Sequence, residues 1–253
     1  MWIKRNLLLI FSLIIVLSAM NMVSFAGTLL EDFSDGNIDG WKRSPQNEKN
    51  NKIFGGIVDG ALMFDPKGQE LGQTDCQMNF VGTPKLSNVH VREWTDYEFE
   101  VDIKYSEHTG WELLPTPGGI RARVDLDSGG HLRIWLYPFL RKMILWKNPF
   151  WNIHDGLVNL GEVPIEPPDV GKFHKLMLSC NGDTIKVFYD GEEKITAKDD
   201  EHKSGTIALD VCDKVVYFDN IKVTGAQIPN VNMSSPVEPA GKFAIAWGEI
   251  KGK

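Results

Sequence analysis

Two sets of polar side chains in this sequence have types and spacings that could act chemically on a ligand. The first is Glu98, Glu100 and Asp102 in YEFEVDIKY, where every second residue is acidic. Alternate residues of a strand point to one face, about 6 to 7 Å apart, so the three carboxylates would share a face. Glycoside cleavage uses such paired carboxylates, one as acid and one as base or nucleophile. A solvated or ion-paired strand face is the alternative.

The second set lies in GGIRARVDLDSGGHLRIWLY, residues 118–137, which alternates strictly between apolar and polar or aromatic side chains. Period-two alternation on both arms, with a Gly-rich connection between them, predicts a β-hairpin. We expect a register that places Arg123 opposite Arg133 and Arg121 opposite Trp135.

One parity of this hairpin presents guanidinium groups and large rings, whereas the other is apolar and can enter a core. Rings stack on the apolar faces of a pyranose, and Arg and carboxylate groups hydrogen-bond its hydroxyls. We expect this face to be at least partly exposed and to share a sheet surface with the acidic parity of YEFEVDIKY. If a loop covers the rings, the expected site moves to a rim around Trp111 and Trp146. The predicted ligand-binding residues are Arg121, Arg123, Trp135, Tyr137, Glu100, Trp111 and Trp146.

The first 26 residues have the pattern of a secretory signal peptide. Lys4 and Arg5 precede an apolar run, and Ser24-Phe25-Ala26 has small residues at the positions that a signal peptidase requires. We therefore expect cleavage after Ala26 and export to the periplasm or the outside of the cell. A retained anchor is the alternative, although the run is shorter than the ~20 residues that span a bilayer.

The remaining chain is acidic. The formal net charge is −7, and removal of Lys4 and Arg5 brings it to −9. Nucleic-acid binding needs a basic surface, so this class of partner is excluded, and a cation or a neutral ligand such as a carbohydrate fits better. No later stretch is apolar enough to span a membrane after cleavage.

Short alternating runs punctuated by turns predict one β-sandwich over residues 27–226. Clear turn signals are Asp59-Gly60 and Asn181-Gly182-Asp183, each between two strand-like runs. Residues 227–253 form a Pro, Asn and Ser linker and a short tail, which could dock as an added strand, serve as an export or attachment signal, or be disordered.

Cysteine and histidine usage gives no metal or nucleophile pattern. Three cysteines allow at most one bridge within the chain; Cys180 and Cys212 are the best pair, but buried thiols are the favoured interpretation. The six histidines lack zinc-site spacing, and His131 and His174 are expected to be surface or strand-end residues. No G-x-S-x-G elbow and no phosphate loop occur.

Four segments together resemble a known superfamily: EDFSDGNIDGW, GIRARV, KFHKLMLSCNGDTIKVFYDG and GTIALDVCDKVVYFDNIKV. In their order along roughly residues 28–225 they are similar to the concanavalin A-like (laminin G-like) jelly-roll domains. The nearest branch is the bacterial 3-keto-disaccharide hydrolase domain. The resemblance implies an all-β fold of two antiparallel sheets, with sugars held on the concave sheet or at its rim.

The resemblance also implies a calcium ion that joins the two chain ends. Related domains place a metal-binding acid where this chain has Asp32, in EDF, and Asp219, in YFDN. Calcium takes six to eight oxygens at ~2.3 to 2.6 Å, so waters and carbonyls, including some near Gly60, would complete its shell. The alternative is that both acids cap backbone amides in ordinary turns.

Three functions remain open from the sequence. The leading hypothesis is an exported carbohydrate-binding module, and the second is a glycoside hydrolase of the 3-keto-disaccharide hydrolase type. Retaining glucanases of the superfamily carry a Glu-Ile-Asp-x-x-Glu pattern, which EFEVDIKY matches poorly because the final Glu is missing. The third hypothesis is an adhesion or structural domain with no small ligand.

Overall fold

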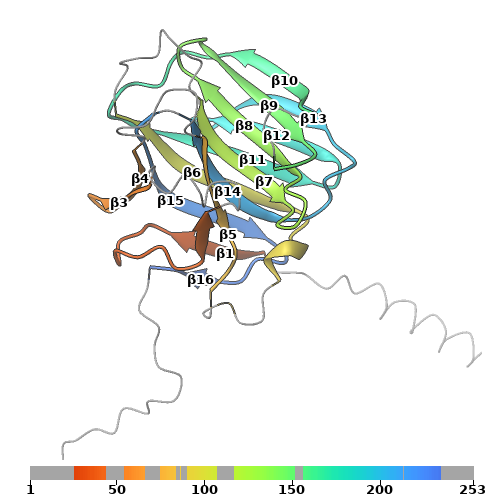
Figure 1. Ribbon diagram of the computed structural model, residues 1–253. Helices are drawn as coiled ribbons and strands as arrows, with labels where there is room; N and C mark the ends of the chain where they lie inside the picture. The colour runs from red at the N-terminus through yellow and green to blue at the C-terminus, as the bar shows by residue number, and fades with distance from the viewer. Residues whose placement is uncertain are drawn as a thin grey trace, which may run out of the picture.

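Two β-sheets lie face to face and form a jelly-roll sandwich (Figure 1). The computed structural model describes residues 26–43, 54–65, 75–83, 86, 90–106, 117–151, 156–212 and 214–234. Within these residues the strands are joined by turns and loops, which include the short 3₁₀ helix Val91–Glu93. No helix among them has the length and apolarity needed to cross a membrane. The predicted all-β, two-sheet fold is confirmed.

The first sheet, sheet A, holds both ends of the described chain. Its strands are β1 (Gly27–Glu31), β3 (Phe54–Val58), β4 (Ala61–Phe64), β6 (Tyr97–Tyr105), β11 (Phe173–Asn181), β12 (Thr184–Tyr189), β13 (Glu192–Lys198), β15 (Val216–Gly225) and β16 (Val231–Asn232). The order across the sheet is β13-β12-β11-β6-β15-β1-β16; β4 also pairs with β15, and β3 with β4. The first and last long strands, β1 and β15, are therefore antiparallel neighbours, as the jelly-roll resemblance implied.

The second sheet, sheet B, contains the hairpin of residues 118–137. Its strands are β2 (Trp41–Arg43), β5 (Asp75–Phe80), β7 (Gly118–Val124), β8 (His131–Tyr137), β9 (Lys142–Asn148), β10 (Val158–Pro164) and β14 (Thr206–Cys212). Their order is β10-β9-β8-β7-β14-β5-β2, so β14 lies directly beside β7. This neighbour, distant in sequence, decides the chemistry of the outer face.

The hydrophobic core lies between the sheets because each strand turns one parity of its side chains inward. On β6, Phe99, Val101 and Ile103 are fully buried, whereas Glu98 is exposed. Ile120 and the other apolar residues of the predicted hairpin meet them from sheet B. The sequence alternation thus predicted correctly which parity packs in the core.

Local turn chemistry explains the hairpins that were expected. Asp59 and Gly60 both have positive φ angles, 53° and 80°, as a two-residue turn between β3 and β4 requires.

Strand β10 was not expected, because its sequence VNLGEVP contains Gly and Pro. It lies at the sheet edge, where these residues are tolerated, and a bulge separates Asn159 from Gly161.

The register of the central hairpin differs from the expected one by two residues. Arg121, not Arg123, pairs with Arg133, and Gly119 pairs with Trp135. Regular pairing stops early because Arg123 has a φ of 50°, which turns the chain out of the ladder. A shift of two residues keeps the paired side chains on their predicted faces, whereas Arg123 leaves its face where the pairing stops.

The C-terminal part of the described chain lies against β1. β16 pairs with it in parallel, and the Ser234 hydroxyl donates to Oε1 of Glu31 at 2.6 Å. Glu31 is buried, and burial raises the pKa of its carboxyl. Residues 235–253 and the predicted signal sequence up to Phe25 lie outside the described residues.

The disulfide that the sequence allowed between Cys180 and Cys212 is not formed. Cys180 lies near the end of β11 in sheet A, whereas Cys212 is the last residue of β14 in sheet B, and no disulfide joins them. Burial raises the pKa of the Cys180 thiol to about 12, so this group stays protonated at neutral pH. The favoured interpretation, an unreactive buried thiol, is confirmed for Cys180.

Candidate functional site

The outer face of sheet B carries a continuous set of polar and aromatic side chains, which we call the sheet-B layer. These residues have the parity opposite to the core and come from β5, β7, β8, β9 and β14. The layer consists of Gln77, Arg121, Arg133, Trp135, Tyr137, Trp146 and Asp210.

An ion pair between Arg121 and Asp210 forms the centre of the layer. The Arg121 guanidinium donates through Nε at 2.9 Å and approaches through Nη2 at 2.8 Å, both to Oδ2 of Asp210. Nη1 donates to Oε1 of Gln77 at 2.5 Å. The side chains of Arg121 and Asp210 have no exposed surface, so the pair is fully desolvated.

Aromatic rings extend the layer across β8 and β9. Trp135 donates its indole N–H to Oδ2 of Asp210 at 2.5 Å, across Gly119, which has no side chain to separate them. The Arg133 guanidinium carbon lies 3.5 Å from the centre of the Trp135 ring, a cation–π contact. The Tyr137 ring meets Trp135 edge to face, with centroids 5.9 Å apart.

The expectation that this face would be partly exposed is wrong. Arg121 and Arg133 are 0% exposed, Trp135 is 6% exposed and Tyr137 is 9% exposed. The charges of Arg121 and Asp210 compensate each other within the layer, and the guanidinium of Arg133 lies against the Trp135 ring. The rings nevertheless form a cluster separate from the main core, as their parity predicted. Burial also raises the pKa of Tyr137 to about 12.

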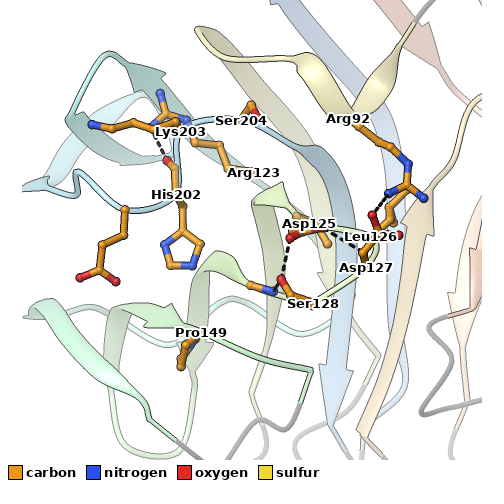
Figure 2. Close-up of a pocket in the computed structure, with 13 residues that line it drawn as sticks. Arg92, Arg123, Asp125, Leu126, Asp127, Ser128, Pro149, His202, Lys203 and Ser204 are labelled. Carbon is orange, nitrogen blue, oxygen red and sulfur yellow. Dashed lines mark hydrogen bonds and ion pairs between the residues drawn. The ribbon is translucent and has the colours of Figure 1, made fainter.

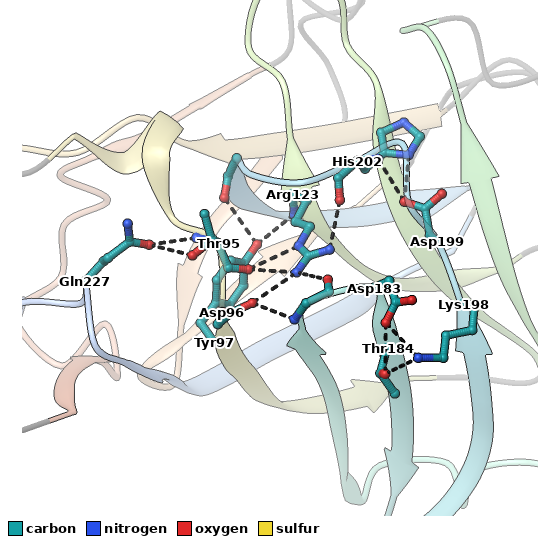
Figure 3. Close-up of polar contacts among 12 residues, drawn as sticks. Thr95, Asp96, Tyr97, Arg123, Asp183, Thr184, Lys198, Asp199, His202 and Gln227 are labelled. Atoms are coloured by element: carbon teal, nitrogen blue, oxygen red, sulfur yellow. Dashed lines mark hydrogen bonds and ion pairs between the residues drawn. The ribbon is translucent and has the colours of Figure 1, made fainter. Parts of the chain in front are cut away.

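Arg123 lies elsewhere, at the end of the sandwich between the two sheets (Figure 3). Its guanidinium donates to the carbonyl oxygens of Thr95, Gly182 and His202 at 2.8 to 3.1 Å. Its backbone N–H donates to the Tyr97 hydroxyl at 2.7 Å. The positive φ of this residue turns it away from the layer, and it fastens three loops instead.

The acidic strand does not share a face with the arginines, which corrects a second expectation. β6 belongs to sheet A, so Glu100 and Asp102 lie on the outer face of the opposite sheet. The Lys175 ammonium lies 3.1 Å from the Glu100 carboxylate and 2.8 Å from that of Asp102. This is the ion-paired alternative, and Glu100 is remote from Trp135.

The two rim tryptophans have different outcomes. Trp111 lies outside the described residues. Trp146, opposite Arg133 on β9, is half-buried and packs against the rings of the sheet-B layer.

The expectation for His131 is also only partly met. His131 begins a strand as expected, but it is fully buried, and burial together with the charges of Arg121 and Arg133 lowers its pKa.

A polar cleft of about 570 Å³ opens at the end of the β7–β8 hairpin (Figure 2), and we call it the hairpin-end cleft. The hairpin loop 125–130 forms one side and the β13–β14 loop forms another. Of the predicted ligand-binding residues that the structure describes, Arg123 is the one that lines this cleft. Other side chains that matter for its chemistry are Arg92, Asp125, Asp127, Ser128, His202 and Ser204.

The hairpin loop presents organised carboxylates to this cleft. Asp125 accepts the Ser128 hydroxyl at 2.6 Å and the Asp127 N–H at 2.9 Å, and these hydrogen bonds lower the pKa of its carboxyl. Arg92 approaches Asp127 at 2.8 Å, with both side chains largely exposed. Carboxylate, guanidinium and hydroxyl groups therefore face the same open space, the combination that hydrogen-bonds sugar hydroxyls.

Aromatic rings flank the same loop. Pro149 lines the cleft, and the following Phe150 is 56% exposed. Trp151 packs on Gly129, where an added Cβ would lie 2.2 Å from the indole, and its N–H donates to the Asp127 carbonyl at 3.2 Å. Trp151 thus packs on the hairpin loop that forms one side of the cleft, and the exposed Phe150 directly follows a residue that lines it.

Sequence reasoning missed Asp210 and most of the cleft residues. Alternation in TIALDVC would have placed Asp210 on an outer face, but nothing local shows that β14 lies beside β7. Arg92, Asp125 and His202 come from three distant segments with no shared motif. Only the Asp-Ser-Gly-Gly turn signal pointed to this end of the hairpin.

The two acids proposed for calcium lie at the junction of β1 and β15. Asp32 Oδ1 accepts the Ser34 N–H at 3.0 Å, and Asp219 Oδ1 accepts the Asn220 N–H at 2.7 Å. Burial raises the pKa of Asp219, and the carboxylates of Asp102 and Asp32 raise it further. Within the described residues, no group of three or more His, Cys, Asp or Glu side chains has the arrangement of a metal site.

The chain was compared with family models, solved structures and curated proteins. A family model described as a 3-keto-alpha-glucoside-1,2-lyase-like domain matches residues 29–224. Solved structures with the same fold include the carbohydrate-binding module CBM66 from Bacillus subtilis, at 20% identity and a TM-score of 0.54, covering 74% of this chain and 96% of that one. A comparison with curated proteins gives no significant match.

Two glucanases have a similar fold at lower identity. The endo-β-1,3-glucanase from Pyrococcus furiosus matches with 13% identity and a TM-score of 0.54, over 78% of this chain and 92% of that one. The catalytic domain of a laminarinase from Thermotoga petrophila RKU-1 has 13% identity and a TM-score of 0.51, over 77% and 95%. At these identities the similarity shows a shared sandwich fold.

Proposed function

Because this chain belongs to the 3-keto-alpha-glucoside-1,2-lyase-like domain family, we propose that it is an exported carbohydrate-binding β-sandwich whose ligand lies in the hairpin-end cleft. The observation that carries this proposal is a polar cleft of about 570 Å³ with exposed aromatic surface beside it. The carbohydrate-binding module and the glucanases of the same fold support a sugar ligand. The signal pattern of residues 1–26 supports export.

The cleft offers both interactions that sugar recognition needs. Asp125, Asp127 and Arg92 present acceptors and donors for hydroxyl groups, and their mutual contacts hold them in place before a ligand arrives. The exposed ring of Phe150 offers an apolar surface for the C–H face of a pyranose.

The first test is a glycan array followed by calorimetry on each glycan that binds. Replacing Arg92 by Gln is expected to weaken binding about tenfold, because one charged donor is lost at the cleft. Phe150→Ala is expected to weaken it to a similar extent through lost stacking. Neither change should alter the melting temperature much, since both side chains are largely exposed.

The other end of the same sheet supplies matched controls. Arg141 forms an exposed ion pair with Glu166, and Phe139 is 47% exposed, both in or beside the β8–β9 turn. Arg141→Gln and Phe139→Ala should leave glycan binding unchanged. Equal losses from both ends, or binding of a partner protein without any sugar, would refute the cleft assignment; the second result would favour the adhesion hypothesis.

Cleavage of a 3-keto-glucoside is the second candidate, and the sheet-B layer is the observation that favours it. Such a lyase removes the C2 proton beside the C3 ketone, and the C1–oxygen bond breaks as the leaving group departs. Guanidinium groups such as those of Arg121 and Arg133 would stabilise the enolate, and a carboxylate would accept the proton. Among the described residues no hydrogen-bond donor faces Oδ1 of Asp210.

The lyase candidate is tested by incubating the protein with a 3-keto-glucoside and following release of the C1 substituent by mass spectrometry. Because the layer is buried, turnover also requires that this face open to the substrate. Release would establish an enzyme, whereas glycan binding without release would leave a binding module.

A calcium ion between Asp32 and Asp219 is part of the proposal. The donor type fits, because carboxylate oxygens are hard ligands. Burial raises the pKa of Asp219, and the nearby carboxylates of Asp102 and Asp32 raise it further. Calcium would neutralise the charges of Asp32 and Asp219 and tie β1 to β15. We expect EGTA to lower the melting temperature by about 5 °C, since an ion that binds the folded chain alone stabilises it.

The EGTA effect should disappear in Asp219→Asn and persist in Asp183→Asn, a control in the β11–β12 turn. An unchanged melting temperature in EGTA would contradict the calcium site. So would an experimental structure with the two carboxylates more than ~8 Å apart, which no single ion could bridge.

A further inference from the structure

One wall of the hairpin-end cleft is the loop that joins β13 to β14, and His202 connects this loop to β9. The His202 ring Nδ1 lies 3.2 Å from Oδ2 of Asp199, at the start of the loop. Its Nε2 lies 3.0 Å from the carbonyl oxygen of Asn148, at the end of β9. Both the ring and Asp199 are shielded, with 11% and 0% of their side chains exposed. The imidazole thus bridges two segments that face the cleft.

Both partners of this ring are hydrogen-bond acceptors. A backbone carbonyl can only accept, and an ionised carboxylate can only accept. A neutral imidazole has one N–H, so it can donate to Asp199 or to Asn148 but not to both. The imidazolium has two N–H groups and satisfies both contacts at once.

The charges around the ring come from every neighbouring segment. Lys147 on β9 lies 2.7 Å from Glu201 and 3.7 Å from Asp199, so both loop acids share one ammonium. From β7, the Arg123 guanidinium donates to the His202 carbonyl at 2.8 Å. From β8, His131 is neutral at physiological pH because burial lowers its pKa. Asp199 is therefore the acid that directly faces the ring.

We propose that His202 is a proton-dependent latch on the wall of the cleft. Charged, it ties the β13–β14 loop to the end of β9; neutral, it releases one of its two contacts. The loop is held most firmly when the ring carries both protons, and part of this local stability is lost when the ring becomes neutral. Regulation of ligand binding by this latch rests on the proposed function, whereas the latch itself does not.

The test reads the latch without any ligand. Two-dimensional ¹H–¹⁵N NMR of the ring nitrogens reports whether His202 is doubly protonated, and hydrogen exchange reports its amide, which donates to Oδ2 of Asp199 at 2.9 Å. We expect two ring N–H groups at pH 5 and one at pH 8. The protection factor of the His202 amide should fall about tenfold between these pH values, in step with the ring.

Two variants separate the latch from general effects of pH. His202→Gln cannot titrate, so its loop should keep one low protection factor from pH 5 to 8. His174→Gln is the matched control and should leave the pH dependence of the His202 amide unchanged. His174 also faces a carboxylate, that of Asp190 at 2.8 Å, but its Nε2 accepts the Asp169 N–H, so both contacts form with a single ring proton.

A neutral His202 ring at pH 5 would overturn the proposal, as would the same pH dependence in His202→Gln as in the unmodified protein. Because neither readout needs a sugar, failure of the carbohydrate proposal would appear separately, as absent binding on the array with the latch intact.

Discussion

Replacing Asp210 by Asn is expected to lower the free energy of unfolding by about 3 to 5 kcal/mol, because it leaves the charge of Arg121 buried without its partner. Arg121 has no exposed surface, so water cannot replace the lost carboxylate. The indole N–H of Trp135 also loses a charged acceptor. Urea denaturation followed by tryptophan fluorescence measures the change.

A paired replacement tests whether the loss comes from the unpaired charge. Arg121→Met combined with Asp210→Leu removes both charges and should be more stable than Asp210→Asn alone, since apolar residues can replace a buried ion pair. Glu166→Gln breaks the exposed pair with Arg141 and should change stability little. A loss well below about 1 kcal/mol in Asp210→Asn would mean that water reaches the layer.

Replacing Arg123 by Met is expected to cost about 3 kcal/mol or more of unfolding free energy. Three carbonyl oxygens, those of Thr95, Gly182 and His202, would lose their donor, and each hydrogen bond from a charged group contributes ~1.5 to 3 kcal/mol. Because these carbonyls belong to three loops at one end of the sandwich (Figure 3), glycan binding in the cleft should be lost as well.

Arg123→Lys is the informative second variant. Lysine keeps the charge but lacks the planar fork that reaches several carbonyls at once, so it should recover only part of the lost stability. Arg92→Gln is the control, because Arg92 also lines the cleft but is exposed and should affect binding without affecting stability. Full recovery by lysine would show that charge alone, and not the fork, holds the loops.

Much of the local structure could be read from the sequence. YEFEVDIKY predicted β6, Tyr97–Tyr105, because alternation with period two is written in consecutive residues. The same property preserved the faces of the central hairpin even though its register was two residues off. Strand β10 could not be predicted, because its Gly and Pro are unfavourable inside a sheet. They are tolerated at a sheet edge, and whether a strand lies at an edge depends on which strands pair with it.

The site depended on pairings between distant segments. The sequence identified Arg121 and Trp135 as outward-facing, but not the buried carboxylate of Asp210 that both contact. Only the position of β14 beside β7 brings Asp210 into reach. It grouped Glu100 with them, whereas strand order puts β6 in the other sheet.

By itself, then, the sequence determined the class of fold, the face on which each side chain of its clear strands lies and the family resemblance, because these are properties of neighbouring residues. The tertiary structure decided which faces meet, which charges are compensated and where a cleft opens. Arg92, Asp125 and His202 become neighbours only when the sandwich closes. A contact of that kind depends on strand order, which no local pattern encodes.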